Sequence, residues 1–150
     1  MTPVDQTRFG CSPGASDDPP GNCWAACIAS LLGVSIAEVP DEMEFWKPGM
    51  HPRDSWRPYE KRMHRWLLER GVVLVEFDLG KAMYCGPNDC IDGMHYILSG
   101  PSPRNPDVLH AVVGRGSPAR IEHDPHHSRD GLKGDPQKWT FEFLIKACNA

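Results

Sequence analysis

Cys23 stands where a breaker-rich loop ends and an apolar, helix-like segment begins, in the stretch GNCWAAC. A thiolate in the first turn of a helix faces unpaired backbone N–H groups and the positive end of the helix dipole, which favour the charged, nucleophilic form. The same N–H groups can stabilise an oxyanion during acyl transfer. Residue type and position therefore predict a nucleophilic thiol, with a buried structural cysteine as the alternative.

A nucleophilic thiol needs a base, usually a histidine that a third polar group orients. His110 opens an apolar, strand-like segment, and Asp124 follows the next such segment. If the two strands pair through the turn at 114–118, residues that flank the turn at similar distances lie across from each other. We therefore expect His110 and Asp124 to meet at one end of a hairpin as base and orienting residue. A strand histidine with only a structural hydrogen bond is the alternative.

The run HDPHH also supplies His123, His126 and His127, which raises a metal site as another interpretation. Neighbouring strand residues point to opposite faces, so three ligands from this one stretch would require a bent backbone. We therefore expect no metal ion and no other cofactor.

Six cysteines could in principle form three disulfides, but nothing in the sequence indicates secretion and a reducing cytosol disfavours them. We interpret them as free thiols, with Cys27, one turn beyond Cys23 on the same helix face, as a core residue. Cys85 and Cys90, followed by His95, raise a zinc knuckle as an alternative. Structural zinc usually needs two close ligand pairs, and only one such pair is visible.

The composition is that of an ordinary globular protein, with 40% hydrophobic and 24% charged residues, and residues 1–150 most simply make one domain. The net charge of −4 and the scattered Lys and Arg residues argue against nucleic-acid binding. The N-terminus shows no apolar run behind a charged start, and no segment approaches the length of a membrane span. We therefore expect a cytoplasmic protein without a nucleic-acid or membrane partner.

Periodicity predicts how these side chains are positioned. Residues 23–32 have the apolar spacing of a buried helix that Gly33 ends, Ser35 and Glu38 fit a capping box, and a second helix is expected at about 58–70, after a loop at 45–56. Strand-like segments then follow at 72–77, 95–98, 109–114 and 119–123, with 139–145 a fifth strand or a terminal helix. Helices followed by strands indicate an α+β domain with an antiparallel sheet.

The segment GNCWAAC at a helix start resembles the catalytic-cysteine segment of papain-like cysteine peptidases, and the later HAVV and HDP segments resemble the His-then-Asp order of that superfamily. With QTRFG, GPSPR and HDPHHSRDGL, the chain resembles small papain-like proteins encoded by bacteriophages, over residues 6–132. The resemblance implies a papain-like fold, in which the helix that carries the cysteine packs on the sheet. It implies Cys23 as nucleophile, His110 as general base and acid, and Asp124 as the residue that orients His110.

The resemblance also implies an oxyanion-binding role for Gln6, although a loop separates it from Cys23 by more than the usual interval, so that Asn22 is a substitute candidate. Trp24, Arg104 and His126 are weaker candidates for substrate binding. Arg104, in GPSPR, has a side chain that can pair with a carboxylate or phosphate, with a plain surface turn as the alternative.

These residues predict a thiol-dependent hydrolase of peptidase, isopeptidase or amidase type, with a thioester intermediate and a peptide or protein as substrate. One alternative is a non-catalytic, phage-type binding protein that keeps a papain-like frame and sequesters a host factor in the host cytoplasm. Another is an acyl transferase of transglutaminase type, which passes the acyl group to an amine.

Overall fold

The computed structural model describes residues 1–10, 17–78, 93–116 and 119–147. The first helix, α1 (Cys23–Leu32), is apolar on nearly all sides, and most of its residues are buried. It ends at Gly33, whose left-handed φ of 70° lets its N–H bond the carbonyl of Ala29 at 2.9 Å. The predicted helix is confirmed at both ends. The predicted capping box is also present, at the start of the short 3-10 helix η1 (Ile36–Glu38).

The second helix, α2 (Pro52–Leu68), starts earlier than predicted, so the expectation of a loop through Trp56 is wrong. The sequence predicts a helix start at about Pro58, but this residue lies inside the helix. Pro52 starts the helix instead, where a proline costs no hydrogen bond, and the His51 side chain accepts a hydrogen bond from the Arg53 N–H. A buried contact anchors this first turn, because Ser55 Oγ donates to Glu42 Oε1 at 2.7 Å.

Five strands form one antiparallel sheet in the order β1-β5-β2-β3-β4. Of the two possibilities for the segment near the C-terminus, the strand is the one found. The α+β class with helices packed on an antiparallel sheet is thereby confirmed. The strands are β1 (Val72–Asp78), β2 (His95–Pro101), β3 (Leu109–Arg115), β4 (Arg120–His123) and β5 (Thr140–Lys146).

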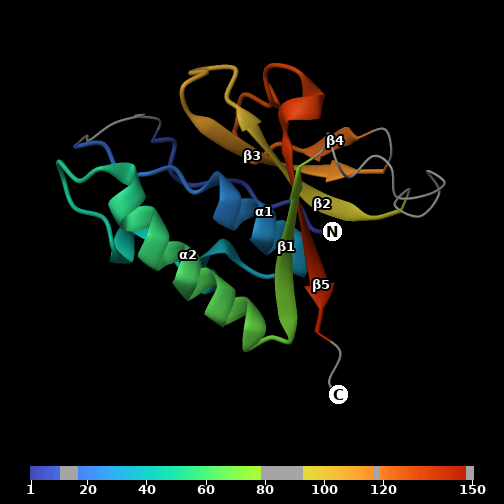
Figure 1. Cartoon of the computed structure of the whole chain (residues 1–150), viewed down its shortest axis with the longest axis horizontal. Helices are drawn as coiled ribbons and strands as arrows, with labels where there is room; N and C mark the ends of the chain where they lie inside the picture. Colours follow the sequence, from blue (N-terminus) through green and yellow to red (C-terminus); the bar gives the residue numbers. More distant parts are fainter. Residues whose placement is uncertain (11–16, 79–92, 117–118, 148–150) are drawn as a thin grey trace.

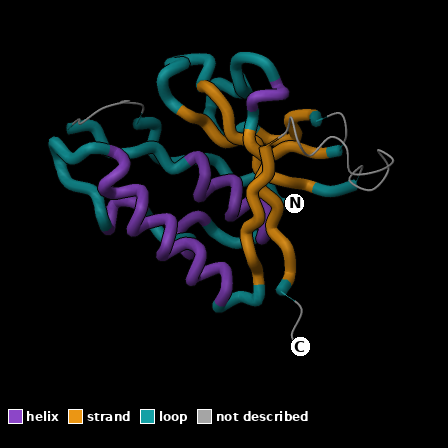
Figure 2. The backbone as a smooth tube through the Cα atoms, viewed as in Figure 1, coloured by secondary structure: helices purple, strands orange, loops and turns teal. Residues whose placement is uncertain are grey.

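Both helices lie on one side of the sheet, as Figures 1 and 2 show, with α1 against β3 and β2 and α2 against β1. Between them lies the main core, which includes the fully buried Cys27, Ile28, Met63 and Leu67. Cys27 is therefore the core residue that its helical position predicts. A second apolar cluster covers the other face, around Tyr96, Leu98, Val112, Trp139 and Phe141. Among the described residues, no single helix is long and apolar enough to cross a membrane.

Candidate active site

The N-terminal segment lies against the start of α1, although a long loop separates the two in sequence. The side chain of Asn22 joins them: its Oδ1 accepts the backbone N–H groups of Thr7 and Arg8, both at 3.0 Å, and its Nδ2 donates to Thr7 Oγ1 at 2.9 Å. The ends of the loop also touch at glycines, because a Cβ on Gly10 would lie 1.7 Å from the carbonyl oxygen of Pro19. The described residues on the two sides of 11–16 are therefore in contact.

Cys23 is the first residue of α1 and is half-buried, whereas Cys27 is fully buried. The Cys23 thiol is close enough to the His110 imidazole to raise the pKa of that ring. Because α1 packs against β3, the first turn of the helix is brought to the strand that carries His110. Burial raises the pKa of the Cys27 thiol well above its ordinary value, so Cys27 stays protonated and inert.

His110 lies near the start of β3 and is only 4% exposed. Its Nε2 is 2.8 Å from Asp124 Oδ1, which leaves Nδ1 as the ring nitrogen that can serve Cys23. Burial disfavours the charged imidazolium, but the hydrogen bonds to Asp124 and Cys23 outweigh this effect and raise the pKa of His110 to about 9. A protonated imidazole at this position can donate a proton to a reacting group beside it.

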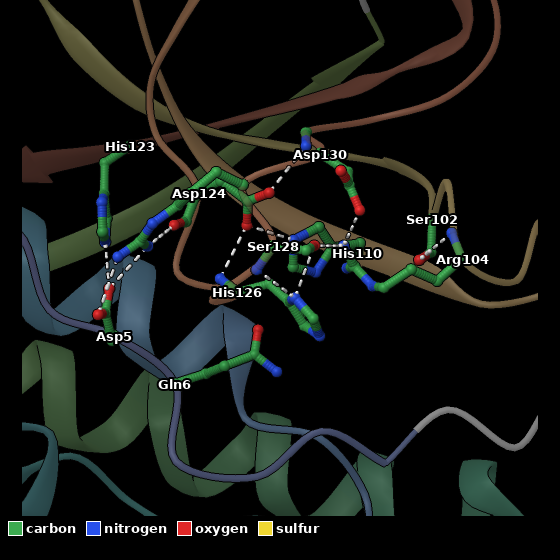
Figure 3. A network of polar contacts seen from close by, with 12 residues as sticks. Asp5, Gln6, Ser102, Arg104, His110, His123, Asp124, His126, Ser128 and Asp130 are labelled. Carbon is green, nitrogen blue, oxygen red and sulfur yellow. Dashed lines mark hydrogen bonds and ion pairs between the residues drawn. The ribbon is translucent and has the colours of Figure 1, made fainter.

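Asp124 follows β4 directly, and a tight turn directs its carboxylate to His110. Besides the bond to His110, Oδ1 accepts the backbone N–H of His126 at 2.8 Å, and Oδ2 accepts that of Gly131 at 2.8 Å (Figure 3). Burial favours the neutral acid, but these hydrogen bonds outweigh it and lower the pKa of Asp124. The carboxylate therefore stays ionised and fixed in orientation, as an orienting residue must.

Gln6 is buried, and the backbone joins it to the loop that carries Asp124, since its N–H donates to the Pro125 carbonyl at 3.0 Å. One hydrogen of its side-chain amide goes to the Arg8 carbonyl at 2.7 Å, so a second N–H remains. Its Oε1 is the one fully buried side-chain oxygen or nitrogen, among the residues described, without a hydrogen-bond partner. The amide is thus incompletely satisfied, whereas Asn22 bonds Thr7 and Arg8 with both ends of its amide.

His126 and Arg104 lie near His110 and Asp124 (Figure 3). The Nδ1 of His126 accepts the backbone N–H of Ser128 at 3.1 Å, so in the neutral ring Nε2 carries the hydrogen. Ser128 Oγ in turn accepts from Arg104 at 2.9 Å. Burial, Arg104 and other nearby cationic groups lower the pKa of His126 and keep it neutral. The rings of His110 and His126 meet edge-on, with centroids 6.2 Å apart.

Trp24, the third candidate for substrate binding, is a core residue. It is 7% exposed, its indole N–H donates to Glu142 Oε2 at 2.6 Å, and its ring packs on Trp56 and Tyr59. These contacts hold the start of α1 against the sheet and α2. The predicted role of Trp24 in substrate binding therefore gains no support from its position.

The histidines of the run HDPHH do not gather at one point. The ring of His123 bonds the carbonyl of Val4 at 3.0 Å, and His126 stacks on His127 with centroids 4.3 Å apart. Within the described ranges, no group of three or more His, Cys, Asp or Glu side chains is arranged to hold a metal ion. Cys85 and Cys90 lie outside the described residues.

The sequence reasoning missed several residues that shape this site. Gly131 presents its N–H to Asp124 at a φ of 72°, and Arg129 contacts both Asp124 and Asp5. The dipeptide Asp130-Gly131 is a common turn signal and could have located the bend. No comparable signal points to Asp5, because its partner stands at the other end of the chain.

Comparisons of the chain with protein-family models, with curated proteins and with solved structures found no match in any of the three. The case for a function therefore depends on the site itself.

Proposed function

We propose that this protein is a thiol-dependent acyl hydrolase of peptidase or amidase type, with a papain-like arrangement of its site. One observation carries the proposal: a half-buried cysteine at a helix start lies within reach of a buried histidine whose other ring nitrogen is held by a buried aspartate. Such a chain of nucleophile, base and orienting group is the geometry that nucleophilic catalysis requires.

Cys23 is the nucleophile. Its thiolate attacks the carbonyl carbon of the substrate, a C–S bond forms, and the carbonyl electron pair moves onto the oxygen. When this tetrahedral intermediate collapses, the bond to the leaving amine breaks, and Nδ1 of His110 gives its proton to the amine. The products of this half-reaction are the free amine and a thioester on Cys23.

Hydrolysis of the thioester uses the same groups in the opposite sense. His110, now neutral, takes a proton from a water molecule, and the water oxygen attacks the thioester carbonyl. The C–S bond then breaks, a carboxylic acid leaves, and the proton returns to the Cys23–His110 pair. Asp124 stabilises the imidazolium in each half-reaction without accepting its proton.

Gln6 is the side chain that we assign to the oxyanion, together with the backbone N–H groups at the start of α1. One of its two amide N–H groups has no hydrogen-bond partner among the residues that the structure describes, and an amide N–H is a donor of the kind that an oxyanion hole needs. Asn22, by contrast, holds Thr7 and Arg8. We therefore assign Asn22 to the loop and not to the oxyanion.

The substrate class follows from this chemistry, since a thiolate with an imidazolium partner suits an amide with a poor leaving group. A peptide bond, an isopeptide bond or a glutamine side chain meets this description. Arg104 and the Nε2–H of His126 stand beside the triad, where they can contact polar groups of the substrate. Transfer of the acyl group to an amine instead of water passes through the same thioester, and product analysis with added amine distinguishes the two.

Two simple probes test the proposal. Iodoacetamide alkylates thiolates, so Cys23 should react at pH 7 at least about ten-fold faster in the wild type than in His110→Ala. Cys27 serves as the buried internal control, and mass spectrometry assigns each rate to its cysteine. With 4-nitrophenyl acetate, the wild type should release 4-nitrophenolate and carry an acetyl group on Cys23.

Two results together would overturn the proposal: equal alkylation rates for Cys23 in the wild type and His110→Ala, and no acetyl group on Cys23. A non-catalytic binding protein on the same frame would give that outcome. The Cys23→Ser variant is the matched control for the acylation, because it keeps the size of the side chain and removes the thiol.

A further inference from the structure

The N-terminal segment and the loop after β4 form two facing edges of the candidate site. Segment 4–6 carries Gln6, and segment 123–125 carries Asp124. The His123 ring contacts the Val4 carbonyl at 3.0 Å and lies 3.6 Å from Asp5 Oδ1, and the Gln6 N–H donates to the Pro125 carbonyl at 3.0 Å. Further along the same loop, Arg129 forms an ion pair with Asp5.

Arg129 contacts both sides of this junction. Its guanidinium meets both oxygens of Asp5, with NH1 at 2.7 Å from Oδ1 and NH2 at 2.9 Å from Oδ2. The same NH1 donates to the backbone carbonyl of Asp124. Figure 3 shows the Asp5 carboxylate close to Asp124, on the side of that residue away from Arg104. One side chain thus joins the residue next to Gln6 to the backbone of Asp124.

The backbone of Arg129 is unfavourable for its residue type. Its φ is 55°, and among the described residues it is the one non-glycine with a positive φ. Both side chains of the ion pair are largely exposed, 58% for Asp5 and 47% for Arg129, and both line a surface cavity of about 460 Å³. An exposed ion pair contributes little to the free energy of folding. Non-glycine residues held at a positive φ cluster at functional sites.

We propose that Arg129 and Asp5 form a clamp that positions Gln6 relative to Asp124, so that the oxyanion donor and the His110–Asp124 pair face the same carbonyl group. Arg129 is in this sense a positioning residue, and the inference rests on the proposed function. The carboxylate of Asp124 keeps its bonds from the His126 and Gly131 N–H groups without Arg129, whereas the segment that carries Gln6 loses an ion pair to this loop and keeps the Val4–His123 and Gln6–Pro125 bonds.

Two reactions of Cys23 can therefore distinguish a loss of the clamp from a loss of the His110–Asp124 pair. Alkylation of Cys23 by iodoacetamide requires the thiolate and forms no oxyanion. Acylation by 4-nitrophenyl acetate requires both the thiolate and the oxyanion donor. Loss of the clamp should therefore slow acylation much more than alkylation.

The variant Arg129→Asn tests this, because asparagine adopts a positive φ readily and the loop should keep its fold. We expect acylation of Cys23 to slow at least about ten-fold, while alkylation changes less than about three-fold and the melting temperature does not fall. Asp5→Asn should have the same effect, and the double variant should be no slower than either single variant. Arg120→Asn, at an exposed position of β4, is the matched control and should behave as the wild type.

The outcomes separate the two proposals. If the wild type reacts with both probes and Arg129→Asn acylates at the same rate, the clamp is wrong and the proposed function stands. If both reactions slow together and the melting temperature falls, Arg129 supports the fold only. If wild-type Cys23 reacts with neither probe, the proposed function fails and the clamp fails with it.

Discussion

Nε2 of His110 lies 2.8 Å from Oδ1 of Asp124, and the two side chains are only 4% and 2% exposed. Because both side chains are buried, the imidazole cannot rotate without losing a charge-assisted hydrogen bond. The bond therefore fixes which ring nitrogen is turned to the thiol. Replacing either partner should change the chemistry of Cys23 more than the stability of the fold.

The variant Asp124→Asn should weaken the hydrogen bond between residue 124 and His110. An amide has one acceptor oxygen and no charge, so it cannot stabilise the imidazolium while it also accepts the N–H groups of His126 and Gly131. We expect the pKa of His110 to fall from its value of about 9 and acylation by 4-nitrophenyl acetate to slow about 10²- to 10⁴-fold. NMR titration of the His110 ring measures the first effect. An unchanged His110 titration in a folded variant would contradict it.

The same pair predicts how stability depends on pH. The pKa of His110 is about 9 in the folded protein against an ordinary 6.5, so the folded state binds the proton more tightly. This contribution is fully present below pH 6.5 and is lost as the pH rises through about 9. For a buried pair it is of the order of 1–3 kcal/mol.

Urea unfolding at several pH values, for the wild type and His110→Gln, measures this effect. The free energy of unfolding of the wild type should fall relative to that of the variant between pH 6.5 and 9. Parallel curves for the two proteins over that range would show that the His110 proton does not stabilise the fold.

Gly131 should be sensitive to substitution for two reasons. Its φ is 72°, and a Cβ there would lie 2.8 Å from Cδ1 of Ile121. Gly131→Ala should therefore cost about 1–3 kcal/mol and displace the N–H that bonds Asp124. Gly134→Ala is the matched control, since Gly134 has a φ of 88° and open space around it. Only Gly131→Ala should slow the alkylation of Cys23, and an equal effect of both variants would disprove this role.

Variants of Asn22 and Gln6 should show which of the two side chains binds the oxyanion. Asn22→Ala removes three hydrogen bonds to Thr7 and Arg8 and should cost about 2–3 kcal/mol. Asn22→Asp keeps both acceptor bonds, and the Thr7 hydroxyl can turn to donate, so this variant should stay folded and active. An oxyanion donor at position 22 would make it inactive instead.

Gln6→Ala should leave the alkylation of Cys23 nearly unchanged but slow acylation by 4-nitrophenyl acetate about 10²- to 10³-fold. The rates of the two probes, measured side by side, check this. A similar loss in Asn22→Asp but not in Gln6→Ala would transfer the oxyanion assignment to Asn22.

Local sequence patterns predicted most elements, because the forces that form them act over a few residues. The apolar spacing of 23–32 and the capping residues Ser35 and Glu38 placed α1 and η1. The predicted start of the second helix was wrong because proline is common at the first position of a helix, and both Pro52 and Pro58 fit that rule. No local pattern shows that Pro52 is the one that starts the helix. Its first turn is anchored by Ser55 and Glu42, a contact between separate segments.

The sequence by itself determined the kinds of residue and their order: a cysteine at a helix start, then a histidine and an aspartate on successive strands. Only the tertiary structure decided which of them meet. Packing of α1 on β3 brings Cys23 to His110, and Asn22 closes the loop that separates Gln6 from the helix. The link between Asp5 and Arg129 spans almost the whole chain, so no local pattern could predict it. The spacing of residue types reflects local preferences for helix, strand or turn, whereas contacts between distant segments depend on how the whole chain packs.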